Sequence, residues 1–371
     1  MFLFLLPILF AIISVFFIVF SYVLIDPNIT FVNTKWWEVF RNWAVNIGYH
    51  QTAASSVAYI FFVILLFIFH FLIVKNYRKI NLLYIIFAVC FVTLLSYPFL
   101  SHDFFNYMFD ARIVTHYHRN PYELMPGFFY DDIWLRFMHW TDRRYPYGPT
   151  FLPLTLIPSF LGLGKFLPTF LLFKTLYMGI FIWSAYLLNK LNKKWVLIYT
   201  THPLILIEGL VNGHLDLIAL SLGIVGVYFL FKEKKLLSRL FLLTSGGIKY
   251  TTLSLIFLSR NKKSKANISV FIIFILTTLY VSYRLEIQPW YFLPVFILLP
   301  YHDRIIGRFN IFFAGLLFSY YPYMINAGWR ETKGIVSKHN IILLFLAINL
   351  LYFLAGSLLS KIKPLRSFRL W

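Results

Sequence analysis

Carboxylates gather in one segment of this chain, residues 101–149. The chain of 371 residues contains only 14 acidic residues, and apolar runs flank the segment on both sides. Six of the 14 lie within it: Asp103, Asp110, Glu123, Asp131, Asp132 and Asp142. A carboxylate at an apolar boundary is partly desolvated, which can raise its pKa into the range useful for proton abstraction. We therefore expect acid–base chemistry in this segment.

Asp103 directly follows an apolar run, in the sequence SHDFFNY. It could simply cap the next helix, because Ser101 and Asp103 are both good N-cap residues. It could instead act as a general base, since a carboxylate at a membrane boundary is partly desolvated. On a helix, Tyr107 lies one turn further on and Asp110 two turns further on, roughly on the same face as Asp103.

Two further motifs lie in the same segment, NPYE (Asn120 to Glu123) and YPYGP (Tyr145 to Pro149). Each by itself is a common turn signal, because Asn-Pro and Gly-Pro dipeptides occur in turns of many proteins. Their order and spacing after SHDFFNY are more specific than either motif alone.

The sequence Asn212-Gly213-His214-Leu215-Asp216 joins two apolar runs. It could be a tight loop followed by a capped helix. Glu208, one turn earlier, adds another carboxylate, and ionisable groups at the ends of membrane spans often serve a function. His214 and Asp216 together could contact a metal ion, but two ligands are too few to define a metal site.

Lys249, in SGGIKYTT, is a basic residue deep within an apolar segment. It could extend its side chain to the membrane surface. It could instead bind a phosphate, as a point charge in a region of low dielectric constant. Residues 288–291 (QPWY) could be interfacial aromatic residues or a platform for a sugar ring or an isoprenoid chain.

The composition predicts an all-α polytopic membrane protein. Hydrophobic residues make up 60% of the chain and charged residues 13%, a proportion that a soluble domain could not bury. The net charge of +20 comes from short Lys and Arg clusters between apolar runs, as in cytoplasmic loops, so we do not expect nucleic acid as a partner. Cys90 is the only cysteine, so an intrachain disulfide is excluded. It lies in an apolar run.

About ten crossings place these basic clusters, and both termini, on the cytoplasmic side. The first apolar run is too long for a signal peptide and lacks a basic start, so we expect a retained span. Residues 26–52 contain three tryptophans and are expected along the outer interface. The expected crossings are residues 3–25, 54–74, 80–100, 167–189, 195–211, 214–231, 266–283, 288–300, 306–323 and 339–360.

Two apolar segments are not expected to cross. Residues 150–163 contain two prolines and should form a short helix in the outer leaflet. Residues 240–259 lie between two basic clusters, which predicts a membrane-inserted hairpin with Lys249 and Tyr250 at its tip. Residues 1–371 then form one transmembrane domain with a large outer loop, 101–149, after the third span. The turns at 212–216 and 284–290 open on the same outer face.

These motifs together resemble the GT-C superfamily of integral-membrane glycosyltransferases. The greatest similarity is to the polyprenol-phosphate-mannose-dependent mannosyltransferases of bacteria and archaea, and it runs from about Leu95 to Tyr291. The chain departs from the family pattern at two places: Ala111-Arg112 stands where Gly-Arg is frequent, and Arg119 stands where a glycine often precedes the Asn/Asp-Pro-Tyr motif.

The resemblance implies an inverting hexosyl transfer, from a polyprenyl-phosphate donor to a glycan or glycolipid acceptor, at the outer face of a bacterial or archaeal plasma membrane. Asp103 is the implied catalytic base, and Lys249 with Arg143 or Arg144 would stabilise the leaving phosphate. No cofactor is required by these motifs, and assistance by a divalent cation stays open. The residues expected to contact donor or acceptor are Tyr107, Asp110, Arg112, Asn120, Tyr122, Arg143, Arg144, Tyr145, Tyr147, Asn212, His214, Asp216, Lys249, Gln288, Trp290 and Tyr291.

Two other classes of function are compatible with a polytopic chain. A lipid or sugar transporter, or a flippase, could use the segment 101–149 as a gate. Such proteins commonly contain inverted repeats and charged groups near the bilayer midplane, whereas this sequence has no visible repeat and concentrates its polar residues at one face. The third possibility is a non-catalytic scaffold in envelope assembly.

Overall fold

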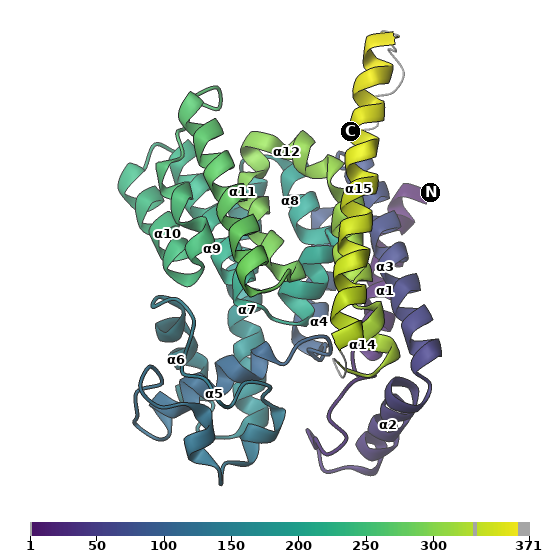
Figure 1. Cartoon of the computed structure of the whole chain (residues 1–371), viewed down its shortest axis with the longest axis vertical. Helices are drawn as coiled ribbons and strands as arrows, with labels where there is room; N and C mark the ends of the chain where they lie inside the picture. The colour runs from purple at the N-terminus through teal and green to yellow at the C-terminus, as the bar shows by residue number, and fades with distance from the viewer. Residues whose placement is uncertain (1, 329–331, 363–371) are drawn as a thin grey trace.

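The computed structural model describes residues 2–328 and 332–362, and every regular element in these two ranges is helical (Figure 1). The longer helices are α1 (Phe2–Phe20), α3 (Thr52–Lys75), α4 (Leu82–Leu95), α7 (Phe166–Asn189), α9 (Leu215–Phe231), α11 (Lys265–Leu285) and α15 (Thr332–Ile362). The shorter α-helices are α2 (Lys35–Val45), α5 (Asp103–Thr115), α6 (Phe151–Leu161), α8 (Lys193–Thr201), α10 (Lys235–Ile248), α12 (Leu299–Arg308), α13 (Asn310–Phe318) and α14 (Tyr321–Ile325). The 3₁₀ and π segments are η1 (Asn46–His50), η2 (Pro126–Phe129), η3 (Ile133–Phe137), η4 (Ile205–Val211), η5 (Tyr250–Phe257) and η6 (Pro289–Leu298).

Four described helices are long and apolar enough to cross a membrane, namely α3, α7, α11 and α15. A fifth crossing is possible if η4 and α9 count as one span, bent by 108° at the break between them. The prediction of an all-α membrane protein therefore agrees with the structure, but ten transmembrane helices are not confirmed. Several expected crossings consist of short pieces instead of one long helix. The expected span 195–211 is divided into α8 and η4, and residues 288–323 are divided among η6, α12, α13 and the start of α14.

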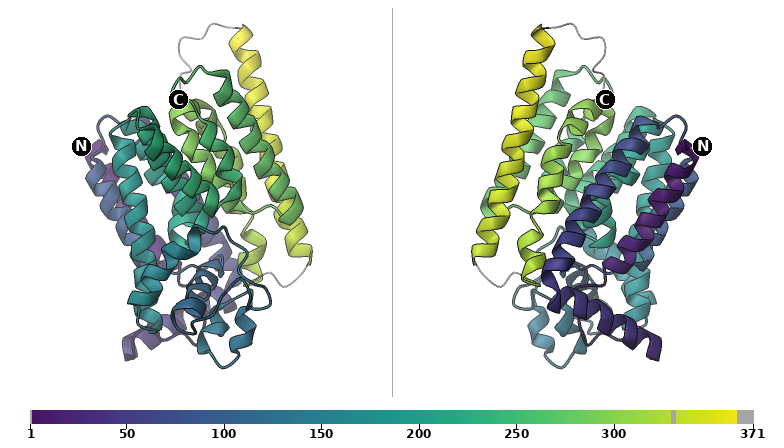
Figure 2. Two further views of the ribbon diagram at one scale, coloured as in Figure 1. Left: turned by 90° about the vertical axis from the view of Figure 1, so that its left-hand side faces the viewer. Right: turned by 90° about the vertical axis from the view of Figure 1, so that its right-hand side faces the viewer.

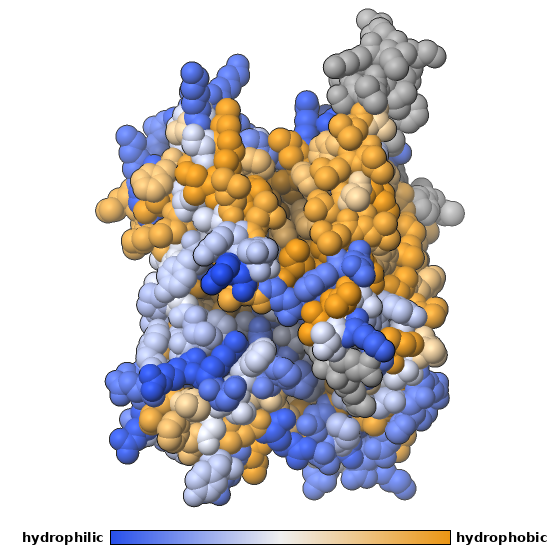
Figure 3. Space-filling model, viewed as in Figure 1, coloured by the Kyte–Doolittle hydropathy of each residue, from blue (hydrophilic) through white to orange (hydrophobic). Residues whose placement is uncertain are grey.

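Basic clusters that are far apart in the sequence meet at one end of the helix bundle. Lys193 donates a hydrogen bond to the carbonyl of Arg78 at 3.2 Å, and Lys194 lies 3.6 Å from Asp303. Arg260 pairs with Glu233 at the same end. Helices α2, α5 and α6 lie at the opposite end (Figures 1 and 2). Figure 3 shows apolar residues over the upper part of the molecule and mainly hydrophilic residues over the lower part.

The two segments that were not expected to cross have the predicted shapes. Helix α6 has 11 residues, too few to cross the hydrocarbon core, and it packs beside α5. Helix α10 ends at Ile248, and the chain reverses at Lys249 into η5. A hydrogen bond of 3.0 Å between the Ser245 and Thr252 hydroxyls links the two arms near this tip.

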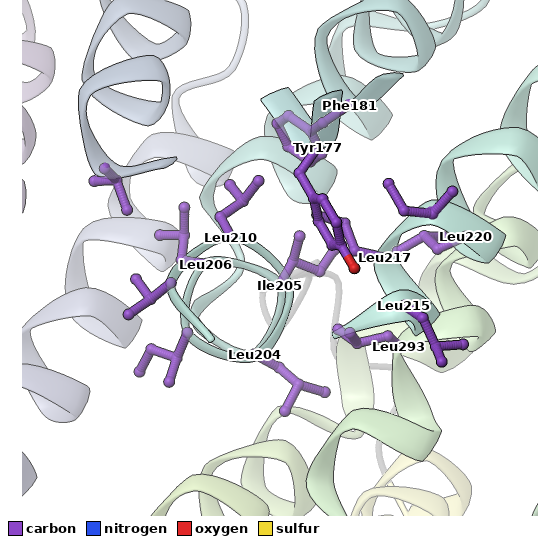
Figure 4. Close-up of a cluster of buried hydrophobic side chains, with 14 of the residues drawn as sticks. Tyr177, Phe181, Leu204, Ile205, Leu206, Leu210, Leu215, Leu217, Leu220 and Leu293 are labelled. Carbon is purple, nitrogen blue, oxygen red and sulfur yellow. The ribbon is translucent and has the colours of Figure 1, made fainter. Parts of the chain in front are cut away.

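The break between η4 and α9 is fixed by a buried lysine. Lys174 of α7 donates hydrogen bonds to the carbonyls of Leu210 (3.2 Å) and Val211 (2.7 Å), which lie at the end of η4. Carbonyls at a helix end need such partners, because no following turn satisfies them. Apolar side chains, among them Leu206 and Tyr177, pack around the break (Figure 4). The turn at residues 212–214 is therefore held in one place.

Candidate active site

Asp103 is the first residue of α5 and its carboxylate faces the bundle. The backbone N–H of Asp103 donates to the hydroxyl of Ser101 at 3.2 Å, and no side chain caps the start of α5, where His102 is the N-cap residue. The Asp103 side chain is 16% exposed, and its Oδ2 lies 3.6 Å from Nδ1 of His214. The carboxylate is thus free for chemistry and reaches both solvent and the buried turn.

His214 lies between two carboxylates. Its Nε2 is 3.3 Å from Oε2 of Glu208, on the side of the ring away from Asp103. The imidazole stacks on the indole of Trp290, with ring centroids 3.8 Å apart and planes inclined by 13°. Both His214 and Glu208 have fully buried side chains. This stacking fixes the orientation of the imidazole ring.

The rest of the turn connects α5 to the bundle. The side chain of Asn212 accepts a hydrogen bond from the backbone N–H of Leu100 at 3.3 Å and donates to Glu208 at 3.2 Å. The N–H of Leu215, at the start of α9, donates to the Tyr107 hydroxyl at 3.5 Å. The expected neighbours of Asp103 on α5 and on the 212–216 turn are therefore brought together.

Lys249 reaches the site from the tip of the hairpin. Its Nζ lies 2.9 Å from Oδ1 of the buried Asp216 and 4.1 Å from the centroid of the Tyr291 ring. Its side chain is 17% exposed. The carboxylate and the aromatic ring together hold an ammonium group that still contacts solvent, as an anion-binding group requires.

A series of tyrosine rings leads from the surface into the site. Tyr122, 42% exposed, contacts Tyr145 at a centroid distance of 5.0 Å. Tyr145 contacts Tyr147 at 5.2 Å, and Tyr147 contacts the buried Tyr107 at 4.9 Å. Arg143 donates to the Tyr147 hydroxyl at 3.3 Å. Rings with hydroxyl groups offer an apolar face and a hydrogen-bonding edge, which suits a sugar.

Asp110 is buried on α5 within reach of these groups. Burial raises the pKa of Asp110 to about 8 from an ordinary 3.8, while nearby Arg143 lowers it and Asp103 raises it. The carboxyl group is therefore mainly protonated at neutral pH. A neutral carboxyl group can donate a hydrogen bond as well as accept one.

Arg112 has one hydrogen-bond partner within the loop and one just after α6. It donates to Asp132 at 2.6 Å and to the carbonyl of Gly164 at 3.1 Å. Burial alone would raise the pKa of Asp132, but the N–H of Trp134, the Tyr117 hydroxyl and Arg112 hold this pKa below its usual range. The contacts of Arg112 thus attach the loop to the end of α6.

Three other expected residues lie away from Asp103 or are already bonded. Asn120 is exposed and donates to Glu123 at 2.8 Å. Arg144 is exposed. The side-chain oxygen of Gln288 accepts a hydrogen bond from Lys338 at 2.7 Å. None of these three is placed against Asp103 by a contact in the described ranges.

Three residues of the site received no role from the sequence. Glu208 was noted only as an extra carboxylate, although a buried acid between two apolar runs is itself a signal. Tyr320 donates to Glu208 at 3.3 Å, and Lys338 lies 2.8 Å from Glu286. Tyr320 directly precedes α14 and Lys338 lies on α15, and no local sequence pattern connects either residue with α5. Among the described residues, no group of three or more His, Cys, Asp or Glu side chains could hold a metal ion.

Comparison with known proteins gives one match. A family model described as the N-terminal domain of alpha-(1->6)-mannopyranosyltransferase matches residues 14–260, more than half of the chain. This agrees with the resemblance to GT-C mannosyltransferases. A search of the curated proteins and a search of the solved structures found no match. The matched range includes Asp103, His214 and Lys249, whereas Trp290 follows it.

Proposed function

We propose, from the premise that this chain belongs to the alpha-(1->6)-mannopyranosyltransferase family and is a glycosyltransferase, that it moves mannose from a polyprenyl-phosphate donor to a glycan or glycolipid acceptor. Transfer takes place at the end of the bundle that contains α5, on the outer face of a bacterial or archaeal plasma membrane. A lipid-linked donor suits this location, because nucleotide sugars are absent outside the membrane. The finer assignments below belong to the same proposal.

The reaction is a single displacement with inversion at the anomeric carbon. A carboxylate oxygen of Asp103 takes the proton of the acceptor hydroxyl as that oxygen bonds to the sugar C1. The bond from C1 to the phosphate oxygen breaks, and polyprenyl phosphate leaves with its electron pair. Lys249 and Arg143 then stabilise the charge that develops on the phosphate. One such group can contribute about 10²–10³-fold to the rate.

The observation that supports this mechanism best is the placement of Asp103 and Lys249 around one aromatic pair. Asp103 faces His214, which stacks on Trp290. Trp290 contacts Tyr291 at a centroid distance of 5.9 Å, and Lys249 lies over that ring. A partly exposed carboxylate and a partly exposed ammonium group thus share one site, as proton removal and phosphate release require.

The series of tyrosines is the proposed acceptor side. It extends from the exposed Tyr122 to the buried Tyr107, one helical turn from Asp103. Asp110 and Arg143 lie beside it and can bond sugar hydroxyls. A sugar that follows these rings would bring its hydroxyl group to the carboxylate of Asp103.

Purified Asp103→Asn tests the assignment of the base. With radiolabelled polyprenyl-phosphate mannose and candidate acceptors, we expect glycan formation to fall about 10²- to 10⁴-fold, because an amide cannot accept the proton. Donor binding and thermal unfolding in detergent should stay close to parental values. Asp142→Asn, an exposed residue of the same segment, is the matched control and should keep parental activity.

Two outcomes would contradict the proposal. Parental transfer by a folded Asp103→Asn would remove the base. Movement of the labelled lipid across the membrane without any glycan product from the parental protein would indicate a flippase instead.

A further inference from the structure

Glu208 is a buried carboxylate for which the proposed reaction has no use. It lies in η4, between apolar residues such as Leu206 and Leu210 that pack into the core (Figure 4). Its side chain is completely buried. An ionised group in such a place is costly unless it is paired and hydrogen-bonded. The partners of this carboxylate therefore indicate its role.

One oxygen of Glu208 faces three polar groups. Oε2 lies 3.2 Å from Nδ2 of Asn212, 3.3 Å from the hydroxyl of Tyr320 and 3.3 Å from Nε2 of His214. Asn212 and Tyr320 donate hydrogen bonds to this oxygen. His214 is the only one of the three that also approaches Asp103. The imidazole ring therefore connects the buried carboxylate with the proposed base.

The geometry of His214 suits a fixed connection. Nε2 faces Glu208 and Nδ1 faces Asp103, at 3.3 Å and 3.6 Å. Stacking on Trp290 restrains the plane of the ring. Each ring nitrogen therefore faces one carboxylate oxygen, and the ring bridges Glu208 and Asp103. Neither ring nitrogen makes a hydrogen bond within the described residues, and such catalytic contacts often tighten only when substrate binds.

We propose that Glu208 is a positioning residue: through His214, it holds Oδ2 of Asp103 so that Oδ1 faces the acceptor hydroxyl. This inference rests on the proposed function, because it assumes that Asp103 is the base. It gives His214 a different role from the substrate contact expected from the sequence, since both nitrogens of the buried ring face carboxylates. Glu208, His214 and Asp103 act in series.

Glu208→Gln is the first test, because glutamine keeps the size and one acceptor oxygen but removes the charge. We expect kcat to fall about 10- to 100-fold, the cost of a slightly misplaced catalytic group. KM for polyprenyl-phosphate mannose should stay within about 2-fold, since Glu208 does not touch the donor. Glu233→Gln makes the same change at the opposite end of the bundle and should keep parental kcat.

A double-mutant cycle separates positioning from a structural role. His214→Phe keeps an aromatic ring against Trp290 but removes both nitrogens, and we expect a similar loss of kcat. If Glu208 acts through His214, the double variant should be no slower than His214→Phe alone. If Glu208 only stabilises the fold, the two losses should multiply, and that result would overturn the proposal.

Thermal unfolding in detergent shows which variants are folded. Parental kcat in folded Glu208→Gln would refute the positioning role. If Glu208→Gln does not fold, His214→Phe carries the test, and parental kcat in that folded variant would refute the role equally. An inactive Asp103→Asn together with a fully active Glu208→Gln would reject this inference alone. An active Asp103→Asn would reject the proposed function itself.

Discussion

Burial determines the protonation state of Asp110. Both Asp103 and Asp110 lie on α5, but Asp110 is only 4% exposed. Burial is the main reason that the pKa of Asp110 is raised to about 8; Arg143 lowers this pKa and the charge of Asp103 raises it. At neutral pH the site therefore contains a protonated carboxyl group beside the proposed base. The protonated group can donate a hydrogen bond to a sugar oxygen, which a carboxylate cannot do.

This pKa predicts a loss of stability with rising pH. The folded protein keeps the Asp110 proton up to about pH 8, whereas the unfolded chain releases it near 3.8. The folded state therefore binds more protons between these values, and stability falls as the pH rises through that range. Asp110→Asn mimics the neutral group and should remove the decrease, which amounts to about 1.4 kcal/mol for each pH unit. Thermal unfolding at pH 6 and pH 8 measures the difference.

Asp131→Asn is the control for this measurement, because Asp131 is an exposed carboxylate of the same segment. It should follow the parental pH dependence. If Asp110→Asn lost stability between pH 6 and pH 8 as steeply as the parental protein, Asp110 would not be protonated in the folded state.

At the scale of elements, the break between η4 and α9 brings the site together. Lys174 holds the end of η4, and the turn then presents Asn212 and His214 to α5. Gly213 at the centre of the turn has φ of +69°, which is left-handed backbone. A Cβ atom there would lie 2.4 Å from Cδ2 of Phe104, the neighbour of Asp103.

Gly213→Ala should therefore damage the site directly. The left-handed conformation costs a residue with a side chain about 1–2 kcal/mol, and the methyl group would also displace Phe104. We expect a lower unfolding temperature and a kcat reduced about 10-fold or more, because displacement of Phe104 moves Asp103. Gly179→Ala is the matched control, since nothing lies within 4 Å of a Cβ at that position. Equal activity of the two variants would show that the turn does not position the base.

The sequence predicts those elements whose signals are local. The spans at 54–74 and 167–189 agree closely with α3 and α7, because a long apolar run is sufficient to define a transmembrane helix. The hairpin at 240–259 also agrees, since the basic clusters on both sides exclude a crossing. The short pieces between residues 288 and 323 were expected as two spans, and there the breaks depend on tertiary packing.

The same distinction applies to the candidate site. Asp103, His214 and Lys249 belong to recognisable motifs, and the structure brings them together. Arg112 belongs to an equally recognisable position, yet it bonds Asp132 on the same loop. Tyr320 contacts Glu208 across more than a hundred residues of sequence, a pairing that only the folded chain reveals.

The whole molecule is electrically asymmetric along the bundle. The loops that contain Arg78, Lys194 and Arg260 meet at one end, and segment 101–149, in which six carboxylates nearly balance five arginines, lies at the other. Cytoplasmic loops of membrane proteins carry an excess of Lys and Arg. The proposed catalytic end should therefore face outward, where lipid-linked sugars are the available donors.

This orientation can be measured with single cysteines, because the chain has only Cys90 to replace. In a Cys90→Ala background, Asp142→Cys marks segment 101–149 and Lys263→Cys marks the end of the bundle where the basic clusters meet. Both positions are exposed. A membrane-impermeant maleimide should label Asp142→Cys in intact cells, because the thiol is expected on the outer side of the membrane. An exposed thiol reacts as its thiolate. Lys263→Cys should react only after the membrane is permeabilised. The reverse pattern would place Asp103 in the cytosol, where nucleotide sugars are present and the reason for a lipid-linked donor is lost.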